Sequence, residues 1–144
     1  MVVAANAAAD IKVFSSTAGD GAAPLNTIAT AAAPWDIAYD ESSDRLYAAL
    51  TNGTVEIFDD FSTDLNAVAD RSIFPADGDG AQLSVNLHGL AILDTQLVVT
   101  DVGDAAVADD GQIFTLTDDG TVAGGISADA RIGADAAGHR SVVG

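Results

Sequence analysis

A threefold internal repeat is the sequence feature that most constrains how this chain folds. Residues 2–14 (VVAANAAADIKVF) return 44 positions later as residues 46–58, and return again, with an insertion, as residues 97–116. A second element at residues 35–39 precedes the middle copy and has its counterpart at residues 88–92, before the third copy. Such a chain is expected to fold as successive copies of one small supersecondary unit.

Each unit is predicted to consist of short β-strands. The repeated segments are rich in β-branched residues and show little helical periodicity. Asn52-Gly53 is a strong hairpin signal, and the glycines of residues 108–112 and 117–121 mark turns of the same kind. The predicted strands are residues 2–5, 10–14, 27–30, 35–39, 45–50, 54–58, 70–74, 87–93, 96–101 and 112–117, a strand within 121–132, and a last strand at 139–144.

These strands make four-stranded antiparallel meanders, and meanders with a period of about 40 to 50 residues are typical of β-propeller blades. We therefore predict an all-β fold of about three blades, half of a six-bladed ring, in a single domain over residues 1–144. The units are residues 2–33, 34–86 and 87–144. With the strands of a blade lettered A to D, the chain reads BCD, ABCD, ABCD and then a new A strand.

Three blades are fewer than the roughly four to eight of a closed propeller. Two copies of the chain supply six, with the terminal A strand of one copy beside the first B strand of the other. We therefore expect a homodimer that completes a six-bladed ring. The alternatives are a fragment of a longer chain, an open form and a β-sandwich. In each of them an unpaired strand edge would tend to recruit another strand.

Acidic residues dominate the charge of the chain. There are 22 Asp and Glu residues, 20 of them Asp, against five Lys and Arg, so the net charge is −17. Residues 1–72 carry 11 acids and 3 bases, and residues 73–144 carry 11 acids and 2 bases. An even spread with Asp preferred is typical of adaptation to molar salt, where screening shortens the range of self-repulsion. A polycation-binding surface and an ordinary acidic exported protein are the alternatives.

Several classes of function are disfavoured by composition. Nucleic acid is not an expected partner, because phosphate contacts need Lys and Arg. The chain has no cysteine, which excludes disulfides and thiolate chemistry. There is no run of 18 apolar residues for a membrane span, and residues 1–6 lack the features of a signal peptide. We expect a soluble chain in a high-salt environment. The sequence does not identify the cellular compartment, and export followed by removal of a signal peptide is one alternative.

The motif at residues 34–40 (PWDIAYD), followed by DRLYAA at residues 44–49, resembles the blades of NHL-type and related six-bladed β-propellers. Those blades read approximately P-x-D/G-I-A-x-D, then L-Y-V-A, then a hairpin to x-I-x-V-F. The match is good in the second unit, fair in the first and degraded in the third, which lacks the initial proline. The resemblance implies the fold but no single function, because this architecture hosts scaffolds, receptors, lactonases and lyases.

Candidate ligand-binding residues are predicted at one mouth of the propeller channel. Trp35 and His88 occupy equivalent places at the start of the innermost strands, and His139, beside Arg140, is a third such place. An aromatic ring, imidazoles and a guanidinium suit an anion or a sugar. The alternative for each is a structural role: a hydrogen-bonded or exposed histidine, and a tryptophan that fills the core.

Two sets of carboxylates are candidate metal ligands. Asp77 and Asp79 alternate with glycines in a loop and offer hard oxygen atoms to Ca²⁺, although they lack the spacing of an EF-hand, and a flexible acidic loop is the alternative. Asp36 and Asp101 are predicted to face the channel, where they belong to the ligand-binding site or hold a metal. Related lactonases use Glu, Asn and Asp of inner strands, whereas both glutamates of this chain fall elsewhere.

We expect a non-enzymatic β-propeller module that serves as an interaction or ligand-binding scaffold and needs no cofactor. One alternative is a Ca²⁺-dependent hydrolase or lactonase of the six-bladed kind, which predicts a tightly retained divalent ion. Another is a structural, strand-swapped repeat fragment without a ligand. The sequence has no nucleophile elbow, phosphate-binding glycine loop, zinc-ligand spacing or HExxH motif.

The acidic surface makes a prediction about stability in salt. If it is an adaptation to molar salt, the thermal midpoint should climb steeply between low salt and molar KCl, because screening relieves the repulsion among carboxylates. Thermal unfolding followed by circular dichroism at increasing KCl measures this. A flat response would show that the charge serves another purpose.

Overall fold

The computed structural model describes residues 1–64, 68–107 and 110–118, and this part of the chain is all-β, as predicted. Its strands form three antiparallel sheets of three, four and three strands, and neighbours in sequence are neighbours in each sheet. One turn of 3-10 helix, η1 (Asn6–Ala8), joins the first two strands. The strands are β1 (Val2–Ala5), β2 (Asp10–Val13), β3 (Asn26–Ala29), β4 (Pro34–Asp40), β5 (Arg45–Leu50), β6 (Val55–Phe58), β7 (Arg71–Ile73), β8 (Leu87–Leu93), β9 (Gln96–Asp101) and β10 (Gln112–Leu116).

The meander prediction is confirmed for the described residues. Each predicted strand there is present, with bounds that agree to within one residue. One sheet falls within each of the units 2–33, 34–86 and 87–144, and the middle sheet has the four strands expected of a complete unit. The strands predicted within residues 121–132 and at 139–144 lie outside the described residues.

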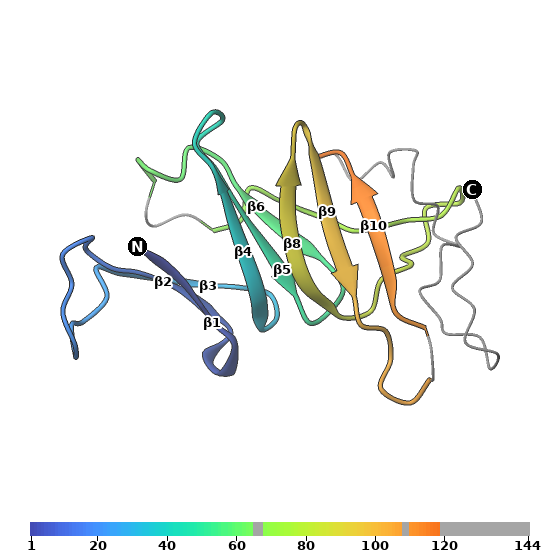
Figure 1. Cartoon of the computed structure of the whole chain (residues 1–144), viewed down its shortest axis with the longest axis horizontal. Helices are drawn as coiled ribbons and strands as arrows, with labels where there is room; N and C mark the ends of the chain where they lie inside the picture. Colours follow the sequence, from blue (N-terminus) through green and yellow to red (C-terminus); the bar gives the residue numbers. More distant parts are fainter. Residues whose placement is uncertain (65–67, 108–109, 119–144) are drawn as a thin grey trace.

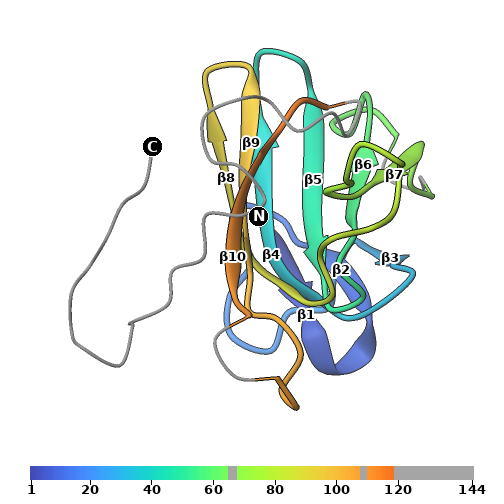
Figure 2. The ribbon, with the colours of Figure 1, turned by 90° about the vertical axis from the view of Figure 1, so that its right-hand side faces the viewer.

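The three sheets stack face to face, with β4–β7 between β1–β3 and β8–β10 (Figure 1). Strand β4 contacts β1 on one side and β8 on the other. Figure 2 views the stack from the side of the third sheet. The first strand of the central sheet therefore lies at both junctions of the stack.

Strand β5 shows how the central sheet serves two cores. Leu46, Ala48 and Leu50 pack against the first sheet, whereas Tyr47 and Ala49 pack against the third. Successive side chains of a strand point to opposite faces, so a strand covered on both sides must be apolar throughout. All five of these side chains are buried, as the continuous apolar run LYAAL requires.

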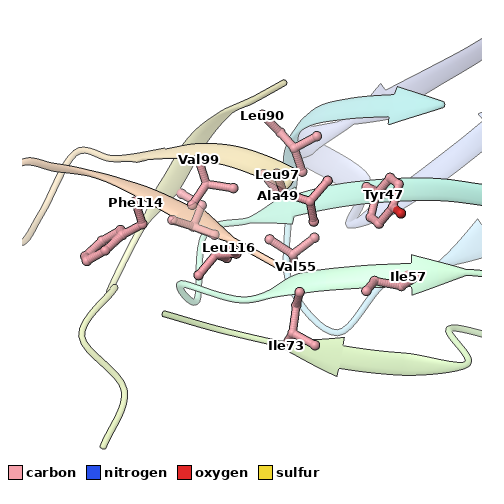
Figure 3. Close-up of a cluster of buried hydrophobic side chains, with 11 residues drawn as sticks. Tyr47, Ala49, Val55, Ile57, Ile73, Leu90, Leu97, Val99, Phe114 and Leu116 are labelled. Atoms are coloured by element: carbon pink, nitrogen blue, oxygen red, sulfur yellow. The ribbon is translucent and has the colours of Figure 1, made fainter. Parts of the chain in front are cut away.

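The core between the central and third sheets is mainly aliphatic (Figure 3). Burial of each large apolar side chain contributes about 1.5–3 kcal/mol, so this junction is a major source of stability. Its buried residues are Tyr47, Ala49, Val55, Ile57, Ile73, Leu87, Leu90, Leu97, Val99, Phe114 and Leu116.

The repeat is shifted by one residue in the first strand of the first unit. Val2 pairs with Val13 in the way that Tyr47 pairs with Ile57, so Val2 corresponds to a position one residue later than the 44-residue period predicts. The connection between β1 and β2 takes up the extra residue through η1 and through Ala9, which has a φ of 51°. The sequence alignment of this one strand was therefore wrong.

Glu56 is a buried carboxyl group in the core between the first and central sheets. Its side chain is only 6% exposed, and Oε1 accepts a hydrogen bond of 3.0 Å from the backbone N–H of Ala31. Oε2 has no hydrogen-bond partner among the described residues. Burial raises the pKa of Glu56 above its ordinary value, and the bond from Ala31 opposes this only in part. The equivalent residue of the third unit is Phe114, and that of the first unit is Lys12.

The sign of this pKa change predicts how Glu56→Gln behaves. Because the folded state holds the proton more tightly than the unfolded state, the contribution of Glu56 to stability is present at low pH and lost as the pH rises through the folded pKa. We expect Glu56→Gln to raise the free energy of unfolding at pH 7 by about 1–2 kcal/mol. It should also flatten the loss of stability with pH.

Urea denaturation in molar KCl, between about pH 4 and pH 8, measures this effect. The matched control is Glu41→Gln, which changes an exposed glutamate in the β4–β5 turn and should leave the profile as it is. Identical profiles for the parent chain and Glu56→Gln would contradict the assignment.

Candidate functional site

Trp35 and His88 occupy the same irregularity in two equivalent strands. The pairing of β4 with β5 shifts register between Pro34 and Asp36, and the pairing of β8 with β9 shifts at the corresponding place. The residue within the shift is Trp35 in β4 and His88 in β8. A β-bulge turns the side chain of its additional residue away from the regular alternation. The predicted equivalence of the two residues thus extends to the local backbone.

The two rings contact each other across the junction of the central and third sheets. Their centroids are 4.3 Å apart and their planes are inclined by 43°. Trp35 remains 46% exposed, and His88 is half-buried. Trp35 belongs to neither core cluster, so it does not fill the core. The pair therefore combines a partly exposed aromatic side chain with two groups able to form hydrogen bonds, the imidazole and the indole N–H.

Asp36, the residue after Trp35, fixes the position of this pair. Its Oδ1 accepts a hydrogen bond of 2.9 Å from the N–H of Ile37, and its Oδ2 accepts one of 2.9 Å from the N–H of Leu90 in β8. The equivalent residue in β8 is Gly89, where a Cβ atom would lie 2.6 Å from Oγ1 of Thr100. One carboxylate therefore joins the two strands that carry the rings.

The carboxylate of Asp101 accepts hydrogen bonds from the backbone just before β8. Its side chain is 4% exposed, and its oxygen atoms accept hydrogen bonds of 3.0, 2.9 and 3.1 Å from the N–H groups of Val85, Asn86 and Gly103. The carboxylate thus holds the segment that leads into β8 and the turn that follows β9. Asp101 pairs with Leu87, the residue before His88. It therefore supports the strand that carries one ring of the pair.

The other predicted site residues are placed elsewhere. Oδ1 of Asp77 accepts hydrogen bonds of 3.0 and 2.8 Å from the N–H groups of Asp79 and Ala81, which closes a turn in the acidic loop. No group of three or more His, Asp or Glu side chains in the described part of the chain is arranged to hold a metal ion. His139 and Arg140 lie outside the described residues.

A cluster of two arginines and two aspartates was not anticipated from the sequence. Nη1 of Arg71 lies 2.6 Å from Oδ2 of Asp59, and Nη1 of Arg45 lies 2.6 Å from Oδ2 of Asp118. Arg45 also donates to Asp59, which joins the four charges. Burial raises the pKa of Asp59, but the two arginines lower it further, so the net change is downward. The sequence holds one signal for this cluster. Arg45 and Arg71 are the first residues of β5 and β7, the two strands that flank β6, and Asp59 directly follows the last residue of β6.

A hollow of about 480 Å³ lies between the first and central sheets. Its walls are mainly apolar, and its lining residues are Val2, Ile37, Tyr39, Leu46, Phe61 and Ser62. We call it the β1 groove, because β1 forms one side of it. This feature could not be predicted from the sequence, because its walls come from two different units.

Comparison with protein-family models, with curated proteins and with solved structures found no match. The arguments for function therefore come from the fold and from the arrangement of side chains. No helix in residues 1–64, 68–107 and 110–118 is long and apolar enough to cross a membrane.

The contacts of Asp101 predict a large effect on stability. Asp101→Ala leaves three N–H groups without their acceptor, and we expect it to lower the free energy of unfolding by about 2–4 kcal/mol. Urea denaturation in molar KCl provides the measurement. The control is Asp79→Ala in the exposed loop, with an expected change within about 0.5 kcal/mol. A loss of less than about 1 kcal/mol in Asp101→Ala would contradict the role of this carboxylate.

Proposed function

We propose that this protein is a non-enzymatic β-propeller module that binds a sugar at the Trp35–His88 pair. We further propose that two copies complete one six-bladed ring, and that the protein works in a high-salt environment. The observation that carries the proposal is the ring pair itself, in contact at two matched bulges and partly open to solvent.

The chemistry of the pair favours a sugar over an anion. The exposed face of an indole suits the apolar C–H face of a sugar ring, and nearby polar groups suit its hydroxyls. An anion would approach against the field of a chain with a net charge of −17. All three Lys and Arg side chains in the described residues are already paired with aspartates: Lys12 with Asp10, and Arg45 and Arg71 with Asp59.

Binding is favoured over catalysis by the state of the nearby carboxylates. Both oxygens of Asp36 and both oxygens of Asp101 accept hydrogen bonds from backbone N–H groups. These bonds hold both carboxylates against the backbone and take up part of their capacity to accept hydrogen bonds. The two carboxylates thus support the geometry of the ring pair, as positioning residues.

The arrangement of the sheets supports the propeller part of the proposal. Each sheet is a meander, the sheets stack face to face, and β4 and β8, the first strands of consecutive units, lie side by side. In a propeller the first strands of the blades surround the central channel. The ring pair at the start of β4 and β8 would then lie at one end of that channel.

Tryptophan fluorescence tests the proposed binding directly, because Trp35 is the only tryptophan of the chain. We expect titration with glucose, galactose and N-acetylglucosamine in molar KCl to give a saturable change with at least one of them. His88→Ala should weaken that binding by about tenfold, which corresponds to about 1.4 kcal/mol. Leu93→Ala, an exposed position on the same strand, is the matched control and should bind like the parent chain.

Inorganic phosphate is titrated in parallel as the anionic probe. Saturation with phosphate alone would overturn the sugar assignment. Saturation that is equally strong in His88→Ala would show that the ligand binds away from the ring pair. The absence of any saturable change with the sugars would overturn the proposal.

A further inference from the structure

The first sheet leaves one side of β1 without a neighbouring strand. In the central sheet the corresponding strand β5 is covered on that side by β4, and in the third sheet β9 is covered by β8. Within the described residues, β1 stands at the edge of its sheet, next to β2 alone. An open edge of this kind is a template for pairing with another extended segment.

The backbone groups that β1 presents outward can be identified. Met1 and Phe14 exchange two hydrogen bonds, of 3.0 and 2.8 Å. Bonded and non-bonded pairs alternate along an antiparallel ladder, so Val3 also bonds inward to β2. Val2 and Ala4 then direct their N–H and C=O groups outward. The open edge of β1 thus offers two residues for strand addition.

The β1 groove lies beside this edge, and the third unit shows what normally fills such a place. Ile37 and Tyr39 of the central sheet line the groove, and Tyr39 is 41% exposed. Their equivalents in the third unit are Leu90 and Ile92, by their pairing with β9. Leu90 is only 9% exposed, and Ile92 packs against the core, because the central sheet with its strand β4 covers them. The groove therefore corresponds to the position of one more first strand.

We propose that residues 139–144 of a second copy of this chain add to β1 as an antiparallel strand and fill the β1 groove. This inference rests on the proposed half-ring and names the contact that joins the halves. His139 follows His88 by 51 residues, close to the 53 residues between Trp35 and His88, so this segment has the place of a first strand in the repeat.

A second copy is favoured over the same chain by the shape of the stack. The first and third sheets lie on opposite sides of the central sheet (Figure 1). The chain therefore leaves β10 on the side of the molecule away from β1. In a pair of copies, the third sheet of each would face the first sheet of the other.

Charge complementarity supports the same occupant. Residues 136–144 contain no acid, one His and one Arg, in a chain with a net charge of −17. The rim of the β1 groove is acidic: Asp44 accepts hydrogen bonds of 2.7 Å from the hydroxyls of Tyr39 and Ser62, and Asp40 follows Tyr39 directly. Residues 139–144 bring no acidic side chain to this rim, and their basic side chains are attracted by the net negative charge of the other copy.

The repeat also gives the register of the added strand. Val3 corresponds to Ala48, which pairs with Ile37, and Ser141 has the place of Ile37 in the repeat. Ser141 therefore lies opposite Val3, and the next residue, Val142, faces the β1 groove. Because the N–H and C=O groups of Val3 bond to β2, Val3 and Ser141 would form a non-hydrogen-bonded pair. The Cβ atoms of such a pair approach each other closely, so a disulfide fits between them.

Engineered disulfides test both the contact and the occupant, because the chain has no cysteine of its own. Chains carrying Val3→Cys and chains carrying Ser141→Cys are mixed and oxidised in molar KCl. We expect cross-linked dimers from the mixture and none from either variant alone. Thr27→Cys, on the far edge of the same sheet, replaces Val3→Cys as the control and should give none.

The doubly substituted chain separates a second copy from the same chain. With Val3→Cys and Ser141→Cys together, a second copy gives covalent dimers, which supports the proposal. An internally cross-linked monomer would overturn the choice of a second copy. The absence of a cross-link in both experiments would overturn the contact itself.

Light scattering on the whole chain in molar KCl supplies an independent measurement. We expect about twice the chain mass of 14.4 kDa. Ala4→Pro removes an outward N–H group without breaking a bond to β2, and should give a monomer. Ala29→Pro is the control, because its N–H group also points outward but from the opposite edge of the sheet, and it should remain a dimer. Circular dichroism shows that both variants are folded.

The outcomes distinguish the failure of this inference from the failure of the proposed function. A dimer that persists in Ala4→Pro and forms no cross-link overturns the strand addition and leaves the half-ring proposal in place. A monomeric parent chain overturns both the strand addition and the half-ring. Sugar binding is read separately, from the fluorescence of Trp35.

Discussion

The burial of both faces of the central sheet is the constraint on which the rest of the structure depends. Strand β5 directs Leu46 and Ala48 toward the first sheet, and Tyr47 and Ala49 toward the third. No smaller set of sheets satisfies this strand, because the loss of either neighbour would return an apolar face to water. Each outer sheet is in turn half of such a pair. The open edge of β1 and the β1 groove arise because, within the described residues, the first sheet has no strand in the place that β4 takes in the central sheet.

The ring pair depends on the same stacking. Trp35 and His88 belong to different sheets, and they meet because the central and third sheets share a core. Asp36 then ties β4 to β8, and Asp101 holds the segment that enters β8. These bonds hold the backbone that carries the ring pair, while Trp35 stays partly exposed, and the proposed recognition of a sugar relies on both conditions.

The charged side chains fall into two groups, those paired within a cluster and those left unpaired at the surface. Arg45 and Arg71 are neutralised within one cluster by Asp59 and Asp118. The remaining carboxylates then dominate the outer surface, and salt screens their mutual repulsion. Two of the described acids are buried instead: Asp101 is held by backbone N–H groups, whereas the burial of Glu56 opposes its ionisation.

The sequence by itself determined the strands, their meander order and the equivalence of Trp35 and His88, because alternation, turn residues and repeats are local signals. Only the tertiary structure decided that the two rings touch, that Asp36 and Asp101 bind backbone N–H groups, and that the arginines pair with aspartates. It also decided the one-residue shift of β1. These features depend on contacts between residues distant in sequence or on the register of a pair of strands, and neither is encoded in any single segment.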